Sequence, residues 1–294
     1  MLSTRARPAF RDTAGTPGPL HLLRQAVSEV TSRRRLIRYL VAADMKKRGS
    51  DTLLGNLWWI LDPLLQMAVY VVFVSIIARR PAPDYPLFIF AAILPWKWYS
   101  AVVTDATGAV VRHASLIRQI AFPKLVLPIS VATAGIVGFG WGLIPLVVIM
   151  LLHPGRFTAM ILWIPVIAFV QYVFSIASAI FVSAANVFFR DLGNVVGHVL
   201  RLWWFLSPSL YSLAALDELH VVQQNPWLRT LAGANPFAVL FEAYRAVIYG
   251  TPDGGPPTAP NLTSLAVLLA GSAILVALVT IFFKRVEPNF SKVL

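Results

Sequence analysis

The sequence predicts an all-α polytopic membrane protein with six transmembrane helices. We also expect an N-terminal amphipathic interface helix, a short cytoplasmic helix between the second and third spans and re-entrant segments before the last span. Of the 294 residues, 57% are hydrophobic and only 13% are charged, and the mean hydropathy of +0.70 lies far above that of a soluble domain. Several apolar runs are long enough to cross a bilayer as helices. The period-two alternation typical of barrel strands is absent from the sequence.

The composition excludes several function classes. A net charge of +12 in a soluble protein would suggest a nucleic-acid partner, but here the basic residues stand beside apolar segments. The positive-inside bias of membrane proteins explains that arrangement, so we expect no nucleic acid. The absence of cysteine excludes disulfides and thiolate metal sites, and the five histidines show no metal-ligand spacing. We therefore expect no metal site.

The N-terminal region divides into a tail and a helix. Residues 1–20, rich in Arg, Pro, Gly and Thr, predict a disordered cytoplasmic tail, and residues 21–294 form one transmembrane domain. Over residues 21–48, apolar positions at helical spacing alternate with basic ones. This pattern predicts an amphipathic helix on the anionic inner leaflet, with a solvated helix as the weaker alternative. Its headgroup-facing residues are Arg33, Arg34, Arg35, Arg38, Lys46, Lys47 and Arg48.

The apolar runs predict where the chain crosses the membrane. We expect spans at about residues 57–78, 86–111, 125–152, 158–189, 195–216 and 262–283. The apolar patch at residues 235–250 is too short and too charged to span, which indicates a re-entrant or interfacial segment. Lys and Arg concentrate on the side that carries both termini, so we expect both termini to be cytoplasmic.

A short basic island lies between the second and third predicted spans. Its apolar residues recur at helical spacing, while basic and polar side chains take the other face, and Pro123 ends the pattern. We expect this segment to lie flat where membrane meets cytoplasm and to present one face to something outside the membrane. An ordinary basic interfacial loop is the alternative. The candidate contact residues are Arg112, His113, Ser115, Leu116, Ile117, Arg118, Gln119, Ile120, Phe122 and Lys124.

Charged side chains inside or beside the spans are functional candidates by default. Lys97 lies deepest, and it is a buried pair partner, a cation stacked on indole or a contact for an anionic substrate. Glu242 and Arg245 stand one helical turn apart and can pair. The polar residues to which we assign structural roles are Asp62, Arg190, Asp191, Glu242 and Arg245.

Aromatic residues gather in the spans and at their ends. An interfacial aromatic belt accounts for many of them, but Trp96, Trp98 and Tyr99 lie too deep for a belt alone. Flat aromatic faces suit sliding contact with sugar rings, because stacking needs no fixed hydrogen-bond pattern. The candidate channel residues are Trp58, Trp59, Tyr70, Trp96, Lys97, Trp98, Tyr99, Trp203, Trp204 and Tyr211.

The motifs for catalysis are missing. The sequence has no Gly-rich phosphate loop, so we do not expect it to hydrolyse nucleotide. The acids Asp62, Asp105, Asp191 and Glu242 include no two on one helical face at catalytic spacing. We assign no catalytic residue, and a membrane-embedded sugar transferase stays open only as a minor alternative.

Five motifs in order resemble the ABC-2 type permeases of polysaccharide export. The run KKRGSDTLLGNLWWILDPLLQMAVY resembles the entry to that family's first span, and LIRQIAFPKLVLPI resembles its coupling segment. FFRDLGNVVGHVLRLWWFLSPSLYS resembles its FRD element before the fifth span. The pattern NPF…E-x-Y-R and the terminal FKRVEPNF complete the likeness, which extends from about Leu22 to the C-terminus. By these motifs the chain is similar to the permeases that export O-antigen, teichoic acid and mycobacterial-type galactan.

The resemblance implies a homodimer joined to two copies of a separate ABC ATPase, which carries ATP and Mg, so this chain needs no cofactor. It also implies that the coupling helix docks on that ATPase. A polysaccharide on undecaprenyl or decaprenyl diphosphate would enter from the inner leaflet of the bacterial inner membrane. It would then thread the dimer interface built from spans one and five. A drug or small-lipid exporter of the same superfamily is the alternative.

Overall fold

The structure, a computed structural model, describes residues 17–49, 54–78, 84–119, 122–153, 155–251 and 254–294. Every regular element in these ranges is a helix, which confirms the all-α fold class. Five of the described helices are long and apolar enough to cross a membrane. They are α3 (Trp58–Ala78), α4 (Tyr85–Thr107), α6 (Val126–Leu151), α7 (Ile164–Phe188, preceded by the 3-10 turn η3, Ala159–Trp163) and α13 (Leu262–Val286).

The predicted fifth span is shorter in the structure than in the sequence pattern. Its helix, α8 (Leu192–Leu206), has 15 residues and therefore rises roughly 22 Å, less than the hydrocarbon thickness of a bilayer. The helix stops because Ser207, which precedes Pro208, adopts an extended backbone with φ −89° and ψ 152°. The apolar run continues to Leu216, but its helix ends at Leu206.

The predicted interface helix 21–48 is two helices. α1 (Pro19–Ser32) begins inside the predicted tail, of which residues 1–16 lie outside the described residues, and α2 (Arg34–Gly49) follows after Arg33. The two helices lie against different partners: α1 buries Leu22 and Ala26 and packs on α13, whereas α2 packs on α6. Arg33 therefore marks a change of direction within one amphipathic sequence.

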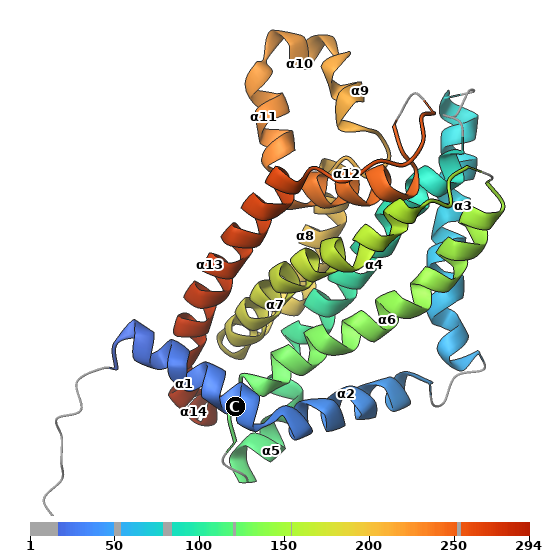
Figure 1. The fold of residues 1–294 in the computed structure, drawn as a ribbon. Coiled ribbons are helices and arrows are strands. Elements are labelled where there is room, and N and C mark those ends of the chain that lie inside the picture. Colours follow the sequence, from blue (N-terminus) through green and yellow to red (C-terminus); the bar gives the residue numbers. More distant parts are fainter. Residues whose placement is uncertain (1–16, 50–53, 79–83, 120–121, 154, 252–253) are drawn as a thin grey trace, which may run out of the picture.

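The short elements gather at opposite ends of the bundle (Figure 1). At one end lie α1, α2, η2 (Val111–His113), α5 (Ala114–Gln119), η4 (Glu287–Asn289) and α14 (Phe290–Val293). At the other end lie α9 (Leu213–Asp217), α10 (His220–Gln224), α11 (Pro226–Ala234) and α12 (Pro236–Ile248). The described residues thus begin, with α1, and end, with α14, at the same end of the bundle.

The centre of the bundle is α4, and its edge is α3. α4 is apolar on nearly all sides and is buried along almost its whole length, in contact with α3, α6, α7, α8 and α12. Among the described side chains of α3 only Pro63 is buried, and the others are exposed or half-buried. The short 3-10 turn η1 (Gly55–Leu57) leads into α3.

Candidate functional site

The predicted coupling segment is built from η2, the six-residue helix α5 and a non-helical stretch from Phe122 to Lys124. Ile117, 7% exposed, belongs to an apolar cluster with Ala26 of α1 and with Phe283 and Phe290 at the end of the chain. The described apolar side of α5 therefore packs on the chain itself.

The outward face of this segment is polar and basic. Arg112, Ser115, Arg118 and Gln119 are exposed, whereas His113, Leu116, Phe122 and Lys124 are half-buried. Ile120 lies outside the described residues. Any partner that meets this surface therefore meets guanidinium, hydroxyl and amide groups.

An ion-pair network fixes the segment to both ends of the chain. Lys284 of α13 lies with its Nζ 2.6 Å from Glu29 Oε2 of α1 and 2.7 Å from Glu287 Oε2 of η4. The other oxygen of Glu287 accepts the backbone N–H of Lys124 at 2.8 Å. Lys284 and Glu287 are both buried and Glu29 is half-buried, so one cation lies between two carboxylates with little access to water. Sequence reasoning missed this network, although the spacing of Lys284 and Glu287 within FKRVEPNF was a signal for it.

An open cleft of about 850 Å³ lies beside the network. Its walls come from α1, from residues 117–119 and 122–124, and from residues 284–291 at the end of the chain. The exposed Arg118 and Gln119 stand on its rim. The cleft joins the coupling segment to the helix α1.

The basic residues predicted to meet lipid headgroups lie on or beside α2. Arg33, Arg34, Arg35, Arg38, Lys46 and Lys47 are exposed, and the side chain of Arg48 lies outside the described residues. The apolar side chains Leu36, Ile37, Leu40 and Val41 are half-buried. Arg190 and Asp191, assigned structural roles from the sequence, are exposed in the turn between α7 and α8.

Most of the deep aromatic residues form the core of this protomer. Trp96 lies within 4.7 to 6.3 Å, between ring centroids, of Tyr99, Trp203, Trp204 and Phe237. Edge-on contacts predominate in this cluster, as expected for the quadrupoles of aromatic rings.

The predicted channel residues therefore divide by exposure. Trp96, Trp98, Tyr99 and Trp204 are each 6% exposed or less and face the interior of the chain. Trp58 is 47% exposed. Trp59, Tyr70, Lys97, Trp203 and Tyr211 are half-buried. Of the ten, only these six offer accessible surface in this conformation.

Arg245 of α12 is buried and forms hydrogen bonds to the backbone of the segment that follows α8. Its Nη1 donates to the carbonyls of Pro208 at 2.7 Å and Tyr211 at 3.0 Å, and its Nη2 donates to the carbonyl of Ser209. The guanidinium carbon lies 3.7 Å from the centroid of the Phe88 ring. These donors satisfy backbone oxygens that the end of α8 leaves without helical partners, which permits irregular backbone in the protein interior.

The pair predicted between Glu242 and Arg245 is present but long, at 3.8 Å. A carboxylate oxygen of Glu242 instead accepts the backbone N–H of Leu213 at 3.2 Å. Asn235, which the sequence analysis did not single out, caps α12 through Phe237 N and accepts Trp203 Nε1 at 3.1 Å. The pattern NPF…E-x-Y-R thus ties α12 to the chain on both sides of Pro208.

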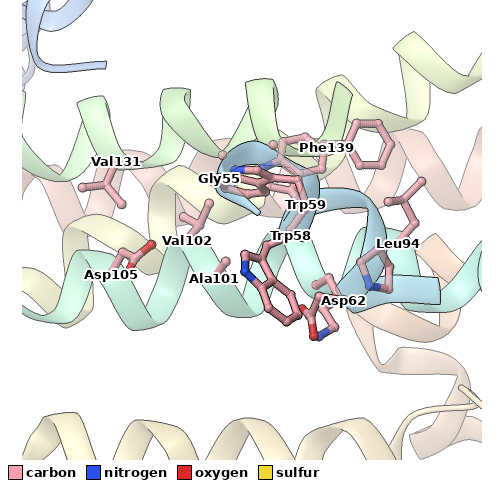
Figure 2. Close-up of a pocket in the computed structure, with 15 residues that line it drawn as sticks. Gly55, Trp58, Trp59, Asp62, Leu94, Ala101, Val102, Asp105, Val131 and Phe139 are labelled. Carbon is pink, nitrogen blue, oxygen red and sulfur yellow. The ribbon is translucent and has the colours of Figure 1, made fainter. Parts of the chain in front are cut away.

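Lys97 pairs with Asp62, as in one of the three roles expected for it, although neither side chain is buried. The pair joins α3 to α4 and borders a pocket of about 360 Å³ between α3, α4 and α6 (Figure 2). The two side chains remain partly accessible, at 31% for Lys97 and 59% for Asp62. In the view of Figure 2, Trp58 and Trp59 lie between Asp62 at one end of the pocket and Asp105 at the other.

Comparison with known proteins places the chain in a family. No family model matches it. It is 33% identical over 251 residues to the O-antigen export system permease protein RfbA of Myxococcus xanthus, an alignment that covers 84% of this chain and 94% of that protein. Two Klebsiella pneumoniae proteins of the same name are 27% identical over 263 residues and 25% identical over 260, each covering 88% of this chain and 95% of the relative. With its apolar helical bundle, this chain belongs to the O-antigen export system permeases, a family of multi-pass ABC-2 type membrane proteins.

Proposed function

We propose that this chain is the transmembrane subunit of an ABC exporter that moves a lipid-linked polysaccharide across the bacterial inner membrane. The observation that carries this proposal is the match to O-antigen export permeases over 84% of the chain. The substrate is a glycan on undecaprenyl or decaprenyl diphosphate, and a separate ATPase subunit binds ATP and Mg. The chain itself is a conduit without catalytic residues.

The arrangement of the bundle supports six crossings with both termini in the cytoplasm. α3, α4, α6, α7, α8 and α13 alternate in direction between the two ends, and α8 with residues 207–212 makes the fifth crossing. The end that holds α1, α2 and α5 also holds exposed arginines, which the positive-inside bias places in the cytoplasm. The exposed arginines of α2 then face the anionic headgroups of the inner leaflet.

A homodimer built on spans one and five agrees with the exposed surfaces. α3 presents Leu65, Val69 and Val72, each more than half exposed, to its surroundings. α8 presents Val199 and Leu202 in the same way. Two copies of the chain with two ATPase subunits at the α5 end form the proposed exporter.

The direct test is transport. The chain and its ATPase are reconstituted into vesicles that contain the diphosphate-linked glycan, and glycan that reaches the far leaflet is measured with and without ATP. We expect ATP-dependent movement of the glycan. ATP-driven extrusion of dyes without glycan movement would identify a drug exporter, and sugar incorporation without ATP would identify a transferase. Either result would overturn the proposal.

A second test addresses the ATPase contact at α5. Because Arg118 is exposed on the rim of the cleft, Arg118→Glu should leave the folded chain intact and lower the yield of copurified ATPase at least fivefold. Ile117→Asp should instead lower the amount of folded chain even without ATPase, because Ile117 lies in the apolar cluster of the chain itself. Arg229→Glu on α11, at the opposite end, is the matched charge-reversal control. Equal copurification of Arg118→Glu and this control would place the contact elsewhere.

A further inference from the structure

The pocket beside Lys97 is a cavity between three helices. Its volume is about 360 Å³, and α3, α4 and α6 supply its walls. Trp58 and Trp59 form an aromatic surface in its middle, as Figure 2 shows, and Phe139 of α6 closes another side. A cavity of this size with aromatic walls and a few polar groups has the usual properties of a small-molecule site.

Two glycines of α6 create the room for its indoles. A Cβ atom on Gly138 would lie 2.2 Å from the ring of Trp59, and one on Gly135 would lie 2.7 Å from Nε1 of Trp98. Both distances are far below van der Waals contact. The indoles of α3 and α4 therefore approach the α6 backbone only because glycine stands at these two positions.

The polar groups stand along one face of α4. Lys97 and Asp105, both lining the pocket, are separated by about two helical turns, or roughly 12 Å. Lys97 is paired with Asp62, yet both side chains keep accessible surface in the cavity. The pocket thus offers an ammonium donor and two carboxylate acceptors around flat aromatic faces.

We propose that this pocket binds one sugar ring of the exported glycan, which rests on the proposed function. A sugar ring carries hydroxyls that both donate and accept, and the pocket supplies acceptors and a donor for them. The C–H bonds on one face of the ring point their positive ends at the negative face of an indole. One ring, or two at most, fits a cavity of about 360 Å³.

Two other ligands fit the chemistry less well. A diphosphate would meet the two carboxylates of Asp62 and Asp105 against the single ammonium of Lys97, so its charges would be repelled. A lipid chain would cover the accessible surface of the Lys97–Asp62 pair without offering it any hydrogen bond. A neutral, hydroxylated ring avoids both costs.

The pocket involves only one of the two helices of the proposed dimer path. Its described lining residues come from η1, α3, α4 and α6, and α8 contributes none of them. A sugar in this pocket is held at the first turns of span one, beside Trp58 and Asp62. The pocket is then a side site that engages one unit of the glycan near the membrane entrance.

The test measures binding without transport. The chain, purified with its ATPase, is titrated with the lipid-free repeat-unit oligosaccharide released from the host's own surface polymer, and affinity is measured by calorimetry with saturation-transfer NMR. Ala101→Leu fills the middle of the pocket and should weaken binding at least tenfold. Asp105→Asn should weaken it three- to tenfold. Thr104→Leu, which adds a similar side chain at an exposed position outside the pocket, should bind as the wild type does.

The outcomes separate this proposal from the proposed function. No binding by the wild type, or equal binding by wild type and Ala101→Leu, would overturn the sugar site and leave ATP-driven transport to be judged by its own assay. A second titration uses polyprenyl diphosphate without sugar. If Ala101→Leu weakened binding of that carrier and not of the oligosaccharide, the pocket would hold the carrier, and the proposal would be wrong. Failure of transport with intact, pocket-dependent sugar binding would instead count against the proposed function alone.

Discussion

Replacing Arg245 by methionine should loosen the outer part of the bundle, because one side chain holds the backbone that follows α8. Methionine keeps the unbranched apolar stem but removes the donors to the carbonyls of Pro208, Ser209 and Tyr211. Arg245 is 2% exposed, so water cannot replace these donors without opening the protein.

The expected loss of stability follows from these contacts. Hydrogen bonds to a charged group contribute about 1.5–3 kcal/mol each, which for three carbonyls gives an upper bound of roughly 5–9 kcal/mol. Removing a buried charge also removes its desolvation cost, which offsets several kcal/mol of that loss. We therefore expect a net destabilisation of about 3–5 kcal/mol. At about 2–4 °C per kcal/mol, the apparent Tm should fall by roughly 6–20 °C.

Thermal unfolding of the detergent-purified chain, followed by tryptophan fluorescence and size-exclusion chromatography, measures this shift. The matched control is Arg229→Met on α11, whose pair with Asp217 is exposed on both sides, at 37% and 57%. That pair is worth about 0–1 kcal/mol, so the control should melt within about 4 °C of the wild type. If the Tm of Arg245→Met equalled that of the control, the hydrogen bonds from Arg245 to the backbone after α8 would not stabilise the fold as argued.

Two further predictions concern stability at other positions. Lys284→Met should leave the buried Glu287 and the half-buried Glu29 without their shared cation, costing about 3 kcal/mol, and limited proteolysis should then cut α1 faster. An unchanged digestion pattern would contradict this role. Gly138→Ala should cost about 1–3 kcal/mol because its Cβ meets a ring at 2.2 Å, whereas Gly140→Ala, with nothing within 4 Å, should be neutral or slightly stabilising. Equal Tm values for the two glycine variants would show that the indole beside α6 moves away freely.

The membrane class, the order of the long spans and the family motifs are all readable in the sequence. Long apolar runs force helices, because a backbone in hydrocarbon must satisfy its own hydrogen bonds. The pattern also predicts that residues 235–250 are too short to span, and α12 has 13 residues. These features depend on local composition and period, which a single sequence displays directly.

The sequence alone identifies the apolar segments. Which side of each segment meets the rest of the chain depends on how the helices pack together. Trp96 and Trp58 are both tryptophans in spans, yet one is 6% exposed and the other 47%, because α4 is surrounded by helices and α3 stands at the edge. Ile117 packs on α1 and the end of the chain, contacts between residues far apart in sequence. Arg245 donates mainly to the carbonyls after α8 and not to Glu242 one turn away. Its planar guanidinium is buried beside backbone oxygens that have no helical partner, and it lies closer to them than to the carboxylate. Such pairings depend on three-dimensional proximity, which the period of a single helix does not reveal.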